Sequence, residues 1–357
     1  AVNKLITPDT HVSLDESSFI KGHRSLRTQR ITFFSERAKY RLAMTGTPLS
    51  EGVVDLFSQM RFLSPKILGY NSFYSFAANH LEYSDLYPDM IVRSHNIDYL
   101  AAKIQPYIYQ VTKEECLDLP NKLFETRYFT MTEEQRYWYE LAKEEILREI
   151  CDGYYDSSTI FRLFTALQQI VSGYWNRKGK QIRFDSDRLD TLCEVILDIP
   201  QNEKIVIFSK YVDHDIDLIK TRLDEIYGRG SVAEYTGRIS EKKRIIEEER
   251  FKHGDARFFL TTQSSGAFGK NLQEAAHYAI FYTNSFKYIE RMQAISRLDR
   301  NGQEYPMTFI DIHCSNSIDG RIDAAIDKKG DVVSLFRNEI DKVKDKKALI
   351  EELIRAI

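Results

Sequence analysis

Short apolar runs alternate with amphipathic segments through residues 185–327 of this chain. Runs such as 205–208 and 307–312 are each followed by small or polar residues. A short apolar run bounded in this way is typical of a strand that is buried on both faces. The alternation therefore predicts an α/β domain in which helices cover both faces of a parallel sheet.

The other elements expected in this half continue the alternation. We expect further strands over 232–235, 258–260 and 279–282, and helices over 189–197, 213–227, 241–251 and 288–298. A shorter version of the pattern occupies residues 1–64. There we expect a strand that ends at Leu14, a helix over 25–39, a strand over 40–44 and a helix over 53–63.

The alternation is lost between residues 65 and 184. Two long helices are expected there, over 132–150 and 160–171, and Thr132 and Gln135 have the spacing of a capping box at the start of the first. The polar stretch 174–187 is expected to be a linker. A helical tail is expected over 331–357, and it is more often a packed or solvated helix than a binding element.

Composition narrows the class of protein. Hydrophobic residues make up 43% and charged residues 29% of the 357 residues, as in soluble globular proteins. No run is long and apolar enough for a membrane span or a signal peptide. None of the four cysteines forms a CxxC pair, so no zinc site is expected. With a net charge of −3, any nucleic-acid contact is expected from a local groove.

Two adjacent carboxylates, Asp15 and Glu16, follow the first expected strand. Ligands of α/β proteins bind at the carboxyl edge of the sheet, where this pair would lie. In nucleotide hydrolases, the first acid of such a pair holds Mg²⁺ and the second polarises the attacking water. Taken alone, the pair is more often a solvated turn.

Two glycine-containing loops also follow expected strands. Thr45-Gly46-Thr47-Pro48 places hydroxyls on both sides of a tight turn, and 262–272 combines small hydroxyls with glycines. Such a loop can direct backbone N–H groups towards phosphates. An ordinary turn and a surface loop are the alternatives.

Arg297 and Arg300 lie three residues apart in the expected helix region and would share one face. Guanidinium groups are planar forks that suit phosphate oxygens, and an arginine finger accelerates phosphoryl transfer by roughly 10³–10⁵. Such a pair is more commonly part of a surface salt-bridge helix. The order of these four elements along one chain, each at a strand end, favours a two-lobed motor.

Taken together, these residues resemble the SNF2 family of DNA-dependent ATPases within the superfamily 2 helicases. Asp15-Glu16 is similar to motif II, 42–65 to motif III, 204–211 to motif IV, 262–272 to motif V and 293–303 to motif VI. The chain departs from the family pattern at Ser17-Ser18, Ala267 and Leu298-Asp299. The Asp-Glu-Ser-Ser (15–18), Asn-Ser-Phe (284–286) and Arg-Leu-Asp-Arg (297–300) sequences resemble those of phage and prophage members.

No GxxxxGK[ST] loop occurs in the sequence. In the family that loop precedes motif II, which begins here at residue 15. The resemblance therefore implies a RecA-like P-loop NTPase architecture with a partial first lobe. The expected domains are 1–64 (carboxyl part of lobe 1), 65–184 (helical insertion and linker), 185–327 (complete lobe 2) and 328–357 (helical tail).

The resemblance also implies roles for individual residues. Asp15, Glu16, Arg297 and Arg300 are expected to be catalytic, with Asp15 holding Mg²⁺; Gly269, Gln293, Arg297 and Arg300 to contact ATP; and Thr47, Ser209, Thr236 and Thr262 to contact DNA. The implied activity is ATP-driven movement on duplex DNA in the cytoplasm of a bacterial or phage-infected cell. Its implied partner is the missing part of lobe 1, without which the chain is expected to be inactive. A non-catalytic binding remnant and a strand-separating or RNA-directed helicase remain alternatives.

Overall fold

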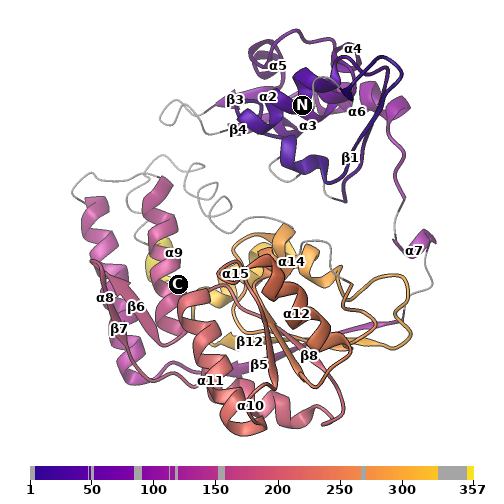
Figure 1. Cartoon of the computed structure of the whole chain (residues 1–357). Helices are drawn as coiled ribbons and strands as arrows, with labels where there is room; N and C mark the ends of the chain where they lie inside the picture. The colour runs from indigo at the N-terminus through magenta and orange to yellow at the C-terminus, as the bar shows by residue number, and fades with distance from the viewer. Residues whose placement is uncertain are drawn as a thin grey trace. The chain divides into compact units, whose positions relative to one another are not determined.

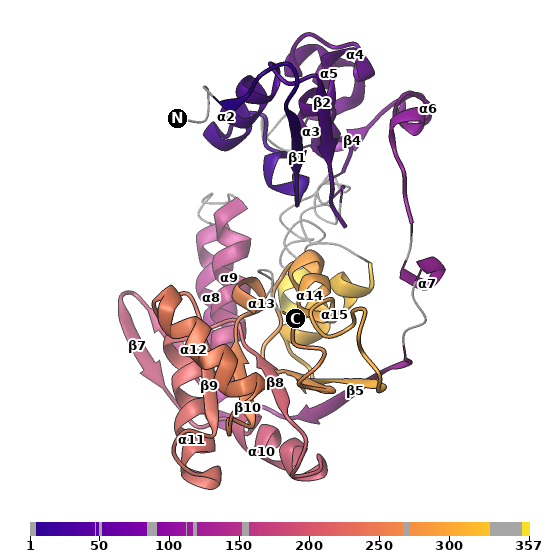
Figure 2. The same cartoon turned by 45° about the vertical axis from the view of Figure 1, so that its right-hand side comes forward.

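The structure, a computed structural model, describes residues 5–46, 48–49, 52–83, 91–111, 113–116, 120–151, 157–266, 271–328 and 352–357. The chain forms two compact units, Ala1–Thr112 and Lys113–Ile357 (Figure 1, Figure 2). The division falls inside the expected insertion 65–184, and the domain limits given above remain predictions.

A six-stranded sheet forms the centre of the second unit, with strand order β5-β12-β11-β8-β10-β9. Its strands are β5 (Lys122–Phe129), β8 (Ile205–Phe208), β9 (Val232–Tyr235), β10 (Phe258–Thr261), β11 (Tyr278–Phe281) and β12 (Met307–Cys314). Every neighbouring pair is parallel. This confirms the α/β sheet that the alternation predicted.

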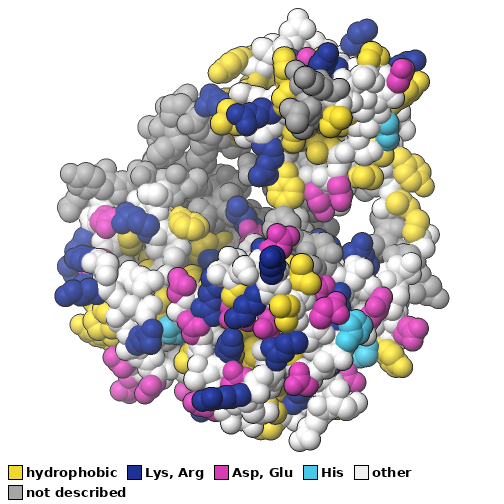
Figure 3. Space-filling view, in the orientation of Figure 1, with side chains coloured by type: hydrophobic (Ala, Val, Ile, Leu, Met, Phe, Trp, Pro, Cys, Tyr) yellow, Lys and Arg dark blue, Asp and Glu magenta, His cyan; other side chains and the backbone are white. Residues whose placement is uncertain are grey.

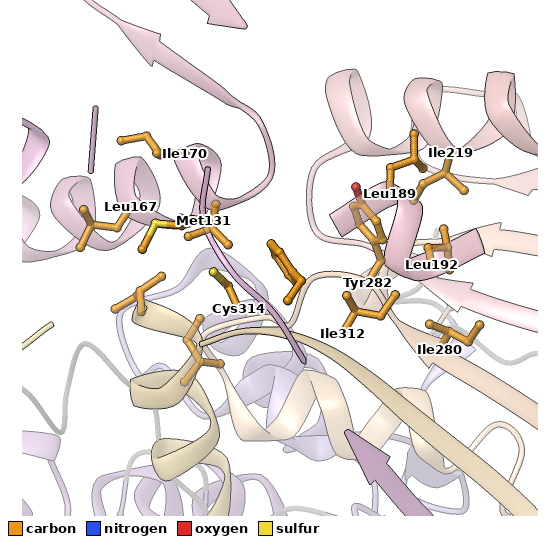
Figure 4. Packing of buried hydrophobic residues seen from close by; sticks show 14 of the residues in the cluster. Met131, Leu167, Ile170, Leu189, Leu192, Ile219, Ile280, Tyr282, Ile312 and Cys314 are labelled. Carbon is orange, nitrogen blue, oxygen red and sulfur yellow. The ribbon is translucent and has the colours of Figure 1, made fainter. Parts of the chain in front are cut away.

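Successive residues of each central strand enter different cores. Ile205 and Ile207 of β8 belong to one apolar cluster, whereas Val206 and Phe208 belong to another. The first cluster includes α8 (Glu133–Cys151), α9 (Ser157–Val171), α10 (Arg188–Asp198), α11 (Asp217–Tyr227) and α15 (Ile318–Asp327), and the second includes α12 (Glu241–Lys252) and α14 (Tyr288–Ile295). Figure 4 shows Leu192, Ile219 and Ile280 converging in the first core. Burial on both faces explains the continuous apolar strand sequences.

Several elements lie where the sequence analysis expected none, among them β5 and a hairpin. Strand β5 pairs with β12 along its whole length, but it is an edge strand whose side chains are mostly exposed, so it lacks an apolar run. The expected linker 174–187 contains an antiparallel hairpin of β6 (Tyr174–Arg177) and β7 (Lys180–Arg183). Lys178 and Gly179 both have positive φ, which suits a tight hairpin turn. The linker prediction was therefore wrong at these residues.

The long helix α8 begins with the reciprocal cap that its sequence predicted. Gln135 N donates to Thr132 Oγ1 (3.2 Å), and Thr132 N donates to Gln135 Oε1 (3.0 Å). The expected terminal helix is described only over 352–357, where Ile354 and Ile357 are buried in the first core. Across the described ranges, no helix has the length and apolarity needed to cross a bilayer.

The first unit pairs a small parallel sheet with a helical core. Strands β1 (His11–Leu14) and β2 (Tyr40–Ala43) are parallel, as expected, and β3 (Leu81–Tyr83) pairs with β4 (Ile91–Ser94) in an antiparallel ladder. The helices are α2 (Leu26–Ser35), α3 (Val54–Leu63), α4 (Pro65–Leu68), α5 (Phe73–His80) and α6 (Ile97–Ile104). Residues of α3 to α6, including Leu56, Phe76 and Leu100, form its core.

Short helical turns complete both units. They are η1 (Ser17–Ile20), η2 (Gln105–Tyr107), α7 (Lys113–Cys116), η3 (Val212–Ile216) and α13 (Gln263–Gly266).

An ion pair inside the second unit joins α10 to α15. The Arg188 side chain is fully buried, pairs with Asp319, and donates to the Tyr282 carbonyl oxygen (2.8 Å). Asp319 also accepts a hydrogen bond from Cys314 N at the end of β12 (3.0 Å). The pair thus holds two helices against the ends of β11 and β12.

Replacement of Arg188 by Met is expected to lower the free energy of unfolding of the second unit by about 3–5 kcal/mol, because it leaves a buried carboxylate without its partner. Urea denaturation of the purified chain measures this change. The matched control is Arg222→Met, which removes the exposed Arg222–Asp190 pair and should change the free energy by about 1 kcal/mol or less. Equal effects of the two substitutions would contradict the role assigned to burial.

Candidate nucleotide and nucleic-acid sites

The predicted catalytic carboxylates form a tight turn in the first unit, directly after β1. Asp15 is exposed, and its Oδ1 accepts a hydrogen bond from Glu16 N (2.9 Å). Glu16 has φ 53°, a left-handed conformation that is uncommon for a residue with a side chain. Ser17 N donates to Met44 O (2.9 Å), which ties the turn to the end of β2.

The chemistry of this turn suits a magnesium ion that is shared with a nucleotide. Mg²⁺ is usually held by one or two carboxylates together with water and substrate phosphates. Within the described part of the chain, no cluster of three or more His, Cys, Asp or Glu side chains could hold a metal by itself. Asp15 is exposed at the carboxyl edge of a parallel sheet. Its carboxylate therefore fits a magnesium site that is completed by water and by the phosphates of a nucleotide.

The loop after β2 also lies at this edge. Met44 N donates to Leu14 O (2.9 Å), so the loop and the carboxylate turn leave the sheet side by side. Thr45, Gly46 and Pro48 are described, whereas Thr47, a predicted DNA contact, lies outside the described residues.

Three further predicted DNA contacts follow strands of the second sheet. Ser209 follows β8, Thr236 follows β9 and Thr262 follows β10, and these neighbouring strands are parallel. The structure therefore brings all three residues to one edge of the sheet, where α/β proteins bind ligands.

The hydroxyls of these residues are engaged inside the unit. Ser209 is buried and donates to Asp215 Oδ2 (2.7 Å), and Thr236 is buried and donates to Glu234 Oε1 (2.8 Å). Thr262 Oγ1 accepts from the backbone N–H of Ser265 (3.0 Å). Contact with DNA through these hydroxyls stays a prediction, and for Ser209 and Thr236, which already donate their hydroxyl hydrogens, it requires these bonds to open.

The helix that carries motif VI ends earlier than its sequence suggested. Helix α14 ends at Ile295 rather than at Leu298. The next backbone N–H groups, of Arg297 and Leu298, donate to carbonyls only three residues back, and Arg297 O accepts a hydrogen bond from Leu272 N (3.2 Å). Arg297 and Arg300 therefore lie in the turn after α14. The expectation that they share one helical face was wrong; Arg297 is partly buried, whereas Arg300 is exposed.

The turn that contains Arg297 and Arg300, here called the arginine turn, is hydrogen-bonded to residues at the end of the motif V segment and just after it. Arg300 Nη1 donates to Asn271 Oδ1 (2.8 Å), and Gln273 Nε2 donates to Asn301 O (3.3 Å). Gln293, a predicted ATP contact, is partly buried on α14 just before the turn. Gly269, another predicted ATP contact, lies outside the described residues.

An ion pair that the sequence analysis missed anchors α14. Arg291 is buried, and its two terminal nitrogens donate to the two oxygens of Asp311 on β12 (2.6 and 2.7 Å). Arg291 also donates to Asn284 Oδ1 (2.8 Å) and lies over the Phe281 ring. Asp311 was the available signal, because it is the one carboxylate in a largely apolar strand.

Charges of both signs cover the visible face of the second unit. Figure 3 shows Lys and Arg side chains interspersed with Asp and Glu side chains in its lower part. This mixture fits a net charge of −3 and the expectation that nucleic-acid contact depends on local groups.

Replacement of Arg291 by Asp is expected to lower the free energy of unfolding by about 3 kcal/mol or more, because two carboxylates then face each other in a buried place. The charge-swapped double variant, Arg291→Asp with Asp311→Arg, should recover a substantial part of that loss. Thermal unfolding of wild type, of each single variant (Arg291→Asp and Asp311→Arg) and of the double variant measures the interaction energy. An additive double variant would show that the pair does not anchor α14.

The carboxylate that holds Thr236 predicts a dependence of stability on pH. Burial alone would raise the pKa of Glu234, but hydrogen bonds from Arg238 and Thr236 and the charge of Lys220 outweigh it and lower the pKa to about 2 from its usual 4.5. A depressed pKa stabilises the fold above the unfolded value, and the effect is lost as the pH falls towards the folded value.

Wild type should therefore be more stable than Glu234→Gln at neutral pH, and this advantage should shrink as the pH falls from about 4.5 towards 2. Urea denaturation of both proteins at several pH values tests the expectation. A difference that stays constant over this range would contradict it.

Two family models together match most of the chain. Residues 6–173 match the SNF2-related domain, and residues 187–302 match the helicase conserved C-terminal domain. The SWI2/SNF2 ATPase core of Sulfolobus solfataricus, solved in complex with dsDNA, is similar in fold, with a TM-score of 0.51 and 24% identity. That similarity covers 97% of this chain and 72% of the solved chain.

Two curated relatives are similar along nearly all of this chain. An uncharacterized ATP-dependent helicase of Mycoplasma pneumoniae is 27% identical over 340 residues, which cover 93% of this chain and 31% of the relative. The ATP-dependent helicase fft1 of Schizosaccharomyces pombe is 24% identical over 413 residues, which cover 96% of this chain and 41% of the relative. The chain spans about a third of the length of the first curated relatives that it matches. On this evidence the chain belongs to the SNF2 family of ATP-dependent helicases, and it has the RecA-like α/β fold of their ATPase core.

Proposed function

We propose that the protein containing this chain is a translocase that couples ATP hydrolysis to movement along duplex DNA. The arginine turn of the second unit, held by its hydrogen bond to Asn271, is the observation that carries the proposal. It presents Arg300 to solvent beside the end of the motif V segment. A guanidinium is a planar fork that suits phosphate oxygens, and this supports the proposed role of Arg300. The Sulfolobus relative in complex with dsDNA supports the choice of duplex DNA.

In this proposal the first unit activates the water that attacks ATP. Asp15 would hold Mg²⁺, and the bound ion would supply positive charge to the β- and γ-phosphates. Glu16 accepts a hydrogen bond from the attacking water and polarises it. Its left-handed backbone holds the carboxylate at the edge of the sheet.

The second unit supplies the groups that face the nucleotide from the other lobe. Arg297 and Arg300 donate to the γ-phosphate as charge develops in the transition state, and Gln293 and Gly269 contact ATP. Thr47, Ser209, Thr236 and Thr262 contact the phosphates of DNA. Such contacts position the protein on the duplex without reading its sequence.

We also infer that an upstream segment with a GxxxxGK[ST] loop completes the first lobe. Parallel sheets are almost always covered on both faces, yet Tyr40 and Leu42 of β2 are 54% and 44% exposed. Helix α2 likewise exposes Leu26 (68%) and Phe33 (63%). These apolar surfaces are suited to burial beneath further strands and helices of the same lobe.

The chain by itself is therefore expected to show little or no ATP turnover, because its sequence contains no GxxxxGK[ST] loop whose Lys could hold the β- and γ-phosphates. With the upstream segment restored, duplex DNA should stimulate turnover, and the protein should displace a third strand from a triplex without unwinding a blunt duplex. ATPase and strand-displacement assays on both lengths measure this. DNA-stimulated turnover by the chain alone would contradict the inferred upstream segment.

In the protein with the upstream segment, Arg300→Ala should lower ATP turnover by roughly 10³ or more, as expected for an arginine finger. Duplex DNA affinity should stay within about twofold of wild type, because Arg300 is not among the proposed DNA contacts. Arg229→Ala, which removes an equally exposed charge from the same unit, is the control and should leave turnover unchanged. Turnover that survives Arg300→Ala would refute the finger assignment.

A further inference from the structure

One buried side chain joins the carboxylate turn to the loop after β2. Gln59 lies on α3 and is 3% exposed. Its Oε1 accepts a hydrogen bond from Ser17 Oγ (2.7 Å), and its Nε2 donates to Pro48 O (2.8 Å) and to Asp55 O (2.9 Å). The side chain thus uses both of its amide hydrogens and its oxygen.

The orientation of this carboxamide is fixed by its partners. Pro48 O and Asp55 O are carbonyl oxygens, which only accept hydrogen bonds, so the amide nitrogen must face them. The oxygen then faces the Ser17 hydroxyl, which can donate. The bond to Asp55 O lies within the same helix and anchors the amide to α3. Gln59 is therefore a fixed link between two loops.

Both ends of the link lie beside groups that the proposed function uses. Ser17 is 1% exposed and directly follows Glu16, whose backbone is left-handed. Pro48 ends the Thr45–Pro48 loop, which includes the proposed DNA contact Thr47. The carboxamide of Gln59 thus bridges the carboxylate turn, which is proposed to activate water, and the loop that is proposed to contact DNA.

We infer that Gln59 is a positioning residue that couples DNA contact at the loop to the placement of Glu16. The inference rests on the proposed function. Hydrogen bonds weaken as they lengthen beyond about 3.2 Å, so a shift of Pro48 either moves the amide, and with it Ser17, or breaks the link. Because Ser17 is bonded directly to Glu16, a movement of Ser17 also moves Glu16.

Link-breaking substitutions separate this role from a purely structural one. Ser17→Ala removes the bond to the carboxylate turn and leaves the bond to Pro48, whereas Gln59→Met removes all three bonds at similar volume. A structural role predicts that turnover with and without DNA falls by the same factor. A coupling role predicts that the ratio of DNA-stimulated to DNA-independent turnover falls.

The experiment uses the protein with its upstream segment and saturating duplex DNA. We expect each substitution to lower the stimulation ratio roughly fivefold or more, the lower end of typical coupling between sites. The double variant should be no lower than the single variants, because both cut one link. Gln105→Met is the matched control, since Gln105 is exposed on the same unit, and its ratio should equal that of wild type.

Thermal unfolding shows which variants are folded, and Ser17→Ala carries the test if Gln59→Met does not fold. A stimulation ratio within about twofold of wild type in a folded Ser17→Ala protein would overturn the coupling while leaving the proposed function intact. Wild type that shows no stimulation by DNA would overturn the proposed function and the coupling together.

Discussion

Burial on both faces is the constraint on which the second unit depends. A parallel sheet satisfies its backbone groups between strands, but both of its faces are apolar and need helical cover. The strands meet this need with residues that enter one core and then the other, as Ile207 and Phe208 do in β8. Because the faces are filled with apolar side chains, polar chemistry is confined to the strand ends, where Ser209, Thr236 and Thr262 lie.

The strand ends are stiffened by polar side chains that bond to one another. Ser209 and Thr283 both donate to the buried Asp215, and Arg291 joins α14 to β12 through Asp311. Buried polar groups of this kind are stable only when their hydrogen bonds are satisfied, so each network fixes the loops that contribute to it. The arginine turn thus directly follows a helix whose position is fixed by the buried Arg291–Asp311 ion pair. In the proposed function this support favours phosphate binding by the arginines, because less ordering remains to be done when the ligand binds.

The first unit shows the same principle on a smaller scale. Its helical core holds α3, and α3 presents Gln59 to two loops at once. The left-handed backbone of Glu16 is tolerated because Ser17 is tied to Met44 O and to Gln59 on its far side. In contrast, β1 and β2 remain a two-stranded parallel sheet with exposed apolar residues. That exposure is the physical basis for the inferred upstream segment.

The sequence by itself determined the α/β class, the central strands and helices of the second unit, and the family. These follow from apolar periodicity and from motifs that are local in the chain, such as 42–65 and 293–303. The tertiary structure decided what depends on distant partners. Strand β5 exists because β12 pairs with it, and the turn after α14 is tied to a distant segment by the hydrogen bond from Leu272 N to Arg297 O. The Arg291–Asp311 pair and the Gln59 link were likewise invisible, because hydrogen bonds between residues far apart in sequence leave no periodic signal.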